Sequence, residues 1–139
     1  MKQSLRILAF AGMLSMVIFL TGCGDSTTSP NTLSVTLSSD KTVYRIGENV
    51  VLTVWASADC YLTLYDTDAT GVTTPIFPNS MASDNLLTGG QTYRIPAESD
   101  TFDFVVTGPA GTERIRAVVV AAANANQQVE NSITVQVVR

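Results

Sequence analysis

The segment VVLTVWASADCYLTLY, residues 50–65, decides the fold class of this chain. Every second residue is apolar from Val50 to Val54, so these side chains share one face of an extended strand. From Tyr61 to Tyr65, leucines alternate with tyrosine and threonine, so an aromatic face backs a leucine face. A period of two residues predicts β-strands and not an amphipathic helix.

The same alternation continues on both sides of this segment, with turn residues roughly every ten positions. The chain of 139 residues also holds 18 Thr and 16 Val, whose β-branched side chains suit pleated strands. We expect an all-β fold, a single antiparallel β-sandwich of immunoglobulin-like type with about seven to eight strands, over residues 33–139. The candidate strands are residues 33–37, 50–54, 61–65, 72–77, 91–95, 101–106, 114–121 and 132–138.

The composition excludes several kinds of function. There is no histidine, which removes imidazole general-base chemistry and the commonest metal ligand. The formal net charge of −4 argues against nucleic-acid binding, which depends on lysine and arginine. No sequence feature calls for a cofactor.

The N-terminus has the layout of an export signal. Lys2 and Arg6 precede an apolar run that ends at Leu20, and Leu20-Thr21-Gly22-Cys23 follows. This motif resembles the lipobox of bacterial lipoproteins, which implies that Cys23 is acylated and becomes the first mature residue. The alternative is a simple secretory signal with an incidental cysteine. We therefore expect a signal peptide at residues 1–22, a lipidated N-terminus and tether at 23–32, and the sandwich at 33–139.

The lipobox resemblance also implies a location. The membrane partner would be reached through the lipid anchor, in the bacterial cell envelope. An Asp directly after the lipidated cysteine tends to retain lipoproteins of enteric bacteria in the inner membrane, but here Gly24 holds that position. We expect the periplasmic face of the outer membrane in preference to the inner membrane.

Landmarks from Tyr44 to Val120 resemble a bacterial family, the domain of unknown function 4384. They include Tyr44-Arg45-Ile46-Gly47-Glu48, Asp59-Cys60-Tyr61-Leu62, Ile76-Phe77-Pro78-Asn79, Gly89-Gly90, Ile95-Pro96 and Gly108-Pro109-Ala110-Gly111-Thr112-Glu113. The family is similar to β-sandwich modules of secreted or anchored bacterial proteins. The resemblance implies an accessory or binding role.

Two segments hold candidate site residues. Asp66 and Asp68 precede Gly71 in a pattern that faintly resembles the start of a calcium loop, and the same residues suit a hairpin turn capped by Asp. Residues 78–88 are polar and irregular, and they form a candidate partner-binding surface with Asn79, Asn85, Leu86 and Leu87. The two leucines either contact a partner or fold over the core as a lid.

We expect a non-catalytic binding module for an envelope protein or a cell-wall component, and not an enzyme. The alternative is a small hydrolase of the envelope that uses carboxylates. An enzyme should show a cleft with two carboxyl groups of raised pKa, whereas a binding module should show an exposed patch or an open edge strand. Cys60 has no sequence neighbour that would activate its thiol, which favours a buried, inert side chain.

Overall fold

The computed structural model describes residues 32–139. The predicted signal peptide, Cys23 and all but the last residue of the tether lie outside the described residues. No helix is present in the described part of the chain, and so none that is long and apolar enough to cross a membrane. Eleven strands make up the domain: β1 (Val35–Ser39), β2 (Val43–Arg45), β3 (Asn49–Val50), β4 (Leu52–Ala56), β5 (Cys60–Thr67), β6 (Thr73–Phe77), β7 (Leu86–Leu87), β8 (Thr92–Ile95), β9 (Phe104–Val105), β10 (Gly111–Ala121) and β11 (Asn124–Val138).

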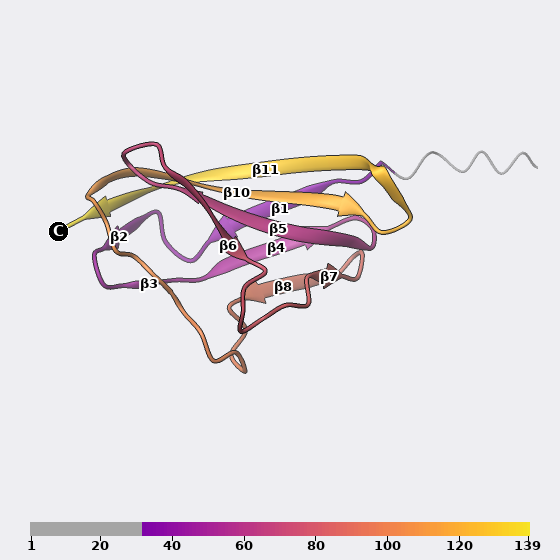
Figure 1. The fold of residues 1–139 in the computed structure, drawn as a ribbon, viewed down its shortest axis with the longest axis horizontal. Coiled ribbons are helices and arrows are strands. Elements are labelled where there is room, and N and C mark those ends of the chain that lie inside the picture. Colours follow the sequence, from indigo (N-terminus) through magenta and orange to yellow (C-terminus); the bar gives the residue numbers. More distant parts are fainter. Residues whose placement is uncertain (1–31) are drawn as a thin grey trace, which may run out of the picture. The chain divides into compact units, whose positions relative to one another are not determined.

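The strands form two main sheets that enclose one core. One sheet has the order β1-β4-β8, and the other has the order β2-β11-β10-β5-β6, with β7 also pairing with β5. Figure 1 shows β10 and β11 on one side of the domain and β4 and β8 on the other. The short strands β3 and β9 pair with each other and form a separate two-stranded sheet. The all-β sandwich predicted from the alternation is confirmed.

The core is built from the inner faces of the strands. Leu62 of β5 lies opposite Val119 of β10, and Leu64 lies opposite Ala117. All four side chains are fully buried. Leu52 and Val54 of β4 are buried in the same core cluster from the other main sheet. The alternation from Tyr61 to Tyr65 thus has its leucine face inside, because burying leucine side chains removes apolar surface from water.

The structure differs from the expected strand set in number and in one direction of pairing. Three strands, β3, β7 and β9, are only two residues long, and β2 has three residues. β2 and β7 lie outside the expected strands, because such short pieces leave almost no periodic signal. The expected strand 50–54 is divided between β3 and β4, and the expected strand 101–106 is reduced to β9. β2 pairs with β11 in parallel, whereas all other pairs are antiparallel. β6, which contains Pro75, is the edge strand of its sheet, a position that tolerates the missing backbone N–H of proline.

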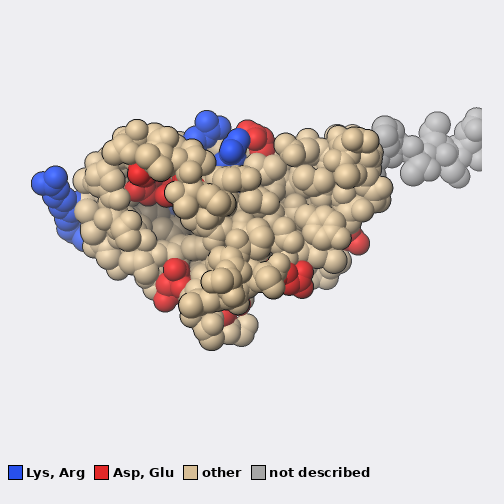
Figure 2. Space-filling view, in the orientation of Figure 1, with Lys and Arg blue, Asp and Glu red and all other residues tan. Residues whose placement is uncertain are grey.

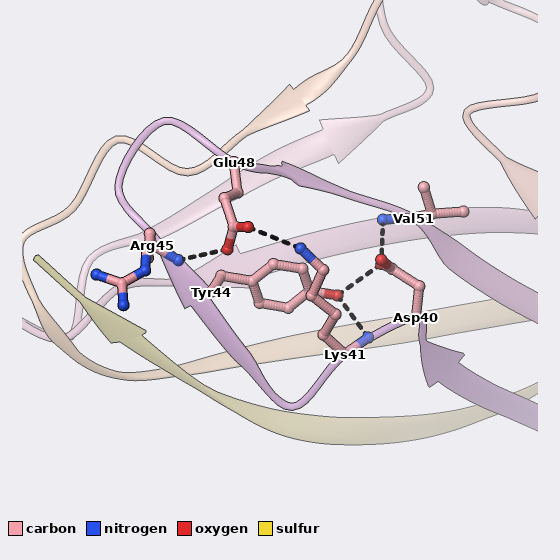
Figure 3. A network of polar contacts seen from close by, with 6 residues as sticks. All are labelled: Asp40, Lys41, Tyr44, Arg45, Glu48 and Val51. Carbon is pink, nitrogen blue, oxygen red and sulfur yellow. Dashed lines mark hydrogen bonds and ion pairs between the residues drawn. The ribbon is translucent and has the colours of Figure 1, made fainter.

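A polar network fixes the connection from β1 to β4 (Figure 3). The fully buried Tyr44 donates a hydrogen bond of 2.7 Å from its hydroxyl to Oδ1 of Asp40, and the backbone N–H of Lys41 donates to the same hydroxyl at 3.1 Å. Oδ1 of Asp40 also accepts from the backbone N–H of Val51 at 2.8 Å. Burial, and then the hydrogen bond to Asp40, raise the pKa of Tyr44 to about 12. The phenol therefore stays protonated. Through Asp40, it links β2 to the end of β1 and to Val51 before β4.

Glu48 closes the turn that follows β2. Its carboxylate accepts from the backbone N–H of Arg45 at 2.7 Å and pairs with the Lys41 ammonium at 2.8 Å (Figure 3). Gly47 has a φ of 98°, a conformation that is unstrained only for glycine. Tyr44, Gly47 and Glu48 of the Tyr44 to Glu48 motif thus each have a structural role in this connection between strands.

Candidate functional site

A cleft of about 680 Å³ opens where β5 ends and β10 begins. One wall is the inner face of the larger sheet, and the other is the segment 101–108 that contains β9. Residues of the β5–β6 hairpin and the turn Asn79–Met81 complete it. Figure 2 shows the hollow on the face drawn, with acidic side chains on both sides of it. Its size is that of a typical small-ligand site.

Two carboxyl groups point inward at this place because of strand periodicity. On β5 the buried series Cys60, Leu62 and Leu64 is followed in phase by Asp66. On β10 the buried series Ile115, Ala117, Val119 and Ala121 is preceded in phase by Glu113. Alternate residues of a strand share a face, so both acids lie on the face that elsewhere forms the core. The cleft is the end of the sandwich where acidic side chains replace apolar ones.

Strand register places the two acids close together. Asp66 lies directly opposite Ile115 in the antiparallel β5–β10 pair, and Glu113 is two residues before Ile115 on the same face. Such diagonal neighbours have Cα atoms about 7–8 Å apart. Both carboxyl groups therefore belong to one wall of the cleft.

Both acids are poorly partnered within residues 32–139: the backbone N–H of Thr67 donates to the carboxyl group of Asp66, and Glu113 has no such bond. Glu113 is only 8% exposed, and its side chain makes no hydrogen bond or ion pair with any residue that the structure describes. Oδ1 of Asp66 is buried and also lacks a hydrogen-bond partner. A buried, unpaired carboxylate is destabilising, so this arrangement needs an explanation beyond folding.

The environment raises the pKa of both groups. Burial, and then the charge of Asp68, raise the pKa of Asp66. Burial, followed by the charges of Asp66 and Asp68, raises the pKa of Glu113. Desolvation and neighbouring negative charge both oppose ionisation. A positive charge placed in the cleft would relieve both effects.

Asp68 has a different role from Asp66. Its Oδ1 accepts hydrogen bonds from the backbone N–H of Thr70 at 2.7 Å, the hydroxyl of Thr70 at 2.6 Å and the backbone N–H of Val72 at 3.1 Å. These bonds, first of all the one from the Thr70 hydroxyl, lower the pKa of Asp68. Gly71 has a φ of 93° in the same turn. Asp68 therefore caps the β5–β6 hairpin. This matches the interpretation of the segment as a hairpin turn capped by Asp.

No metal-binding arrangement accompanies these acids. Within residues 32–139, no three or more Cys, Asp or Glu side chains are grouped closely enough to hold a metal ion. The calcium site suggested for Asp66 and Asp68 stays a prediction.

The opposite wall of the cleft is largely apolar. Phe102 and Phe104 line it and pack edge to face, with ring centroids 5.4 Å apart. Val50 and Val106 lie beside them, and Met81, which is 67% exposed, lies at the cleft's margin. A ligand entering the cleft thus meets the inward-pointing Asp66 and Glu113 on one side, and aromatic surface together with the exposed Asp103 on the other.

The candidate surface at residues 78–88 divides into separate parts. Leu87 is 3% exposed and belongs to the core, whereas Leu86 is 48% exposed. Both are in β7, where Leu87 lies opposite Cys60 and Leu86 opposite Tyr61. One leucine acts as a lid over the core, and the other remains available for contact.

The two asparagines of that surface serve the backbone. Asn85 donates from Nδ2 to the carbonyl oxygen of Leu62 at 2.8 Å. Oδ1 of Asn79 accepts from the backbone N–H groups of Met81 and Ala82. Asn79 also lines the cleft, while Asn85, Leu86 and Leu87 do not. The structure therefore does not bring the four residues into one site.

Cys60 is fully buried and forms no disulfide within the part of the chain that the structure describes. Burial, and then the charge of Asp59, raise the pKa of its thiol. A thiol with a raised pKa holds little thiolate and is a poor nucleophile.

Glu113 is the site residue that sequence reasoning missed. In the sequence it stands only at the end of the landmark Gly108-Pro109-Ala110-Gly111-Thr112-Glu113. Its position in phase with Ile115 and Ala117 was the available signal, because a charge on an otherwise apolar strand face predicts an inward-pointing carboxyl group.

The fold and the cleft define a β-sandwich domain with an acidic, aromatic-walled cleft. A family model described as Domain of unknown function (DUF4384) matches residues 43–122, more than half of the chain, and the protein belongs to this family. The matched range includes both Asp66 and Glu113. A search of curated proteins finds no match.

Proposed function

We propose that this protein is a lipid-anchored component of the bacterial cell envelope whose β-sandwich is a non-catalytic binding module, with the cleft as its binding site. The observation that carries the proposal is Glu113, a residue only 8% exposed that lines a cleft of ligand size and whose carboxyl group has no hydrogen-bond partner among the described residues. Folding alone does not favour such a group, whereas a bound partner would compensate its burial. The partner is an envelope protein or a cell-wall component.

The anchor rests on the motif that ends at Cys23. In a bacterial host, the wild-type protein should incorporate a palmitate analogue, and Cys23→Ala should abolish labelling and leave an uncut precursor. Unchanged labelling and maturation in Cys23→Ala would refute the anchor without affecting the cleft.

Photo-crosslinking in cells tests the cleft. A photo-reactive residue in place of Met81, at the margin of the cleft, should give a discrete crosslinked product that Glu113→Ala removes. The control position is Gln128 on β11, which is exposed and does not line the cleft. If both positions give the same products, and Glu113→Ala changes neither, the cleft is not the binding site.

A carboxylate-dependent hydrolase is the second candidate. Asp66 and Glu113 share a cleft and both have raised pKa values, which is the feature expected of an enzyme. Glycoside hydrolysis needs two carboxyl groups that flank the scissile bond. Asp66 and Glu113 lie on one wall, and Asp103, which lines the opposite wall, is an exposed residue. Turnover of envelope glycan or peptide that Asp66→Asn abolishes would favour the hydrolase over the binding module.

A further inference from the structure

The charges around the cleft are all of one sign. Asp66, Asp68, Asp103 and Glu113 line it, and no lysine or arginine of residues 32–139 does so. Asp66 approaches from β5, Asp68 from the β5–β6 turn and Asp103 from the segment before β9, while Val135 of β11 lies opposite Glu113. The cleft therefore repels anions and favours a ligand with positive charge.

The unsatisfied atoms specify the kind of positive group. Glu113 and Oδ1 of Asp66 offer hydrogen-bond acceptors that no described residue fills. An ammonium or guanidinium group supplies charged N–H donors, which make the strongest hydrogen bonds to carboxylates.

The apolar wall specifies what carries that group. Phe102, Phe104 and Ile76 line the cleft beside the acids. Aromatic and aliphatic surface suits the methylene stem of a lysine or arginine side chain, and an aromatic face also attracts the cation itself.

On the basis of the proposed function, we infer that the cleft binds an aliphatic ammonium or guanidinium group, with Glu113 and Asp66 as its acceptors and the Phe102–Phe104 wall against its methylene stem. Lysine and arginine side chains of a partner and free alkylamines share this chemistry.

Isoleucine methyl groups report on this site in the purified full-length protein in detergent micelles. Ile76 and Ile115 line the cleft, whereas Ile95 and Ile133 do not. At constant ionic strength, Nα-acetyl-lysine amide should shift the methyl signals of Ile76 and Ile115 saturably and leave the other two unchanged. The uncharged Nα-acetyl-norleucine amide should bind at least about tenfold more weakly, since it lacks the charged donor.

The source of the cation is tested with pentylammonium. If it binds as well as the lysine derivative, the ligand is a free amine; if it binds more weakly, the peptide groups contribute and a protein side chain is the ligand.

Two variants and a control test the acceptors. Glu113→Gln and Asp66→Asn should each weaken binding of Nα-acetyl-lysine amide by about tenfold or more, as expected when one partner of a desolvated charge pair is lost. Glu98→Gln makes the same chemical change at an exposed residue outside the cleft and should leave the affinity within about twofold.

Three results would overturn the inference. Equal binding of the lysine and norleucine derivatives would show that the cleft binds a neutral group, and the proposed binding function would survive. Calcium chloride shifting the same methyl signals at lower concentration would show a metal site. If no probe shifts Ile76 or Ile115, the cleft takes no cation, and the Met81 crosslink then decides separately whether it binds anything.

Discussion

Glu113 of β10 and Asp66 of β5 share one inward-facing wall, and no lysine or arginine in the described part of the chain lines the cleft with them. Burial and the charge of Asp66 raise the pKa of Glu113. In most domains the strand face that carries these acids would be completed with apolar residues. Here the sheet keeps two carboxyl groups where the sandwich opens, and the proposed cation site rests on this pair.

The first prediction concerns stability and pH. A carboxyl group whose pKa is raised in the folded state stabilises the fold below its unfolded pKa, and this contribution is lost as pH rises through the folded pKa. Glu113→Gln should therefore be more stable than wild type at pH 8, and the difference should shrink as pH falls to about 4. Each pH unit between the two pKa values corresponds to about 1.4 kcal/mol.

Urea unfolding at several pH values measures this difference, with Glu98→Gln as the matched control that should follow the wild type. A Glu113→Gln variant that is less stable than wild type at pH 8 would show that Glu113 has a stabilising partner in the folded protein.

The second prediction concerns the pH dependence of binding. A cation favours the ionised carboxyl group, so binding should lower the pKa of Glu113 and release protons. The affinity for Nα-acetyl-lysine amide should fall as pH falls through the raised pKa of the free site. Calorimetry in buffers of different ionisation enthalpy measures the released protons. Proton uptake on binding would contradict this linkage.

The third prediction concerns Tyr44. Tyr44→Phe removes the hydroxyl that bonds to Asp40 and Lys41, and it leaves a carboxylate oxygen and an N–H with fewer partners. The expected loss of unfolding free energy is about 1–3 kcal/mol. Tyr61→Phe is the control, because Tyr61 is exposed on the outer face and should change stability by less than about 0.5 kcal/mol. Equal effects of the two substitutions would mean that the network of Figure 3 contributes little.

The fourth prediction separates the two leucines of β7. Leu87→Ala should cost about 2–5 kcal/mol, since it leaves a cavity in the core beside Cys60. Leu86→Ala removes a half-exposed side chain and should change the unfolding free energy by less than about 1 kcal/mol. Thermal and urea unfolding measure both. A large effect of Leu86→Ala alone would place that side chain in the core.

The sequence by itself was sufficient for the fold class and for the main strands. Alternation from Val50 to Val54 and from Tyr61 to Tyr65 is a local property, and it follows from the two-residue period of an extended chain. The family landmarks from Tyr44 to Val120 also follow from sequence alone, and the family model confirms them.

Only the tertiary structure decided where the site lies. Asp66 and Glu113 are far apart in the chain, and the register of β5 against β10 brings them together. Alternation indicates which residues share a face of one strand, but it does not indicate which strands become neighbours. Strand pairing is set by the packing of the whole core. The same reason explains why Leu87 is core and Leu86 is not: adjacent strand residues point to opposite faces, and only the pairing of β7 with β5 determined which face was inside.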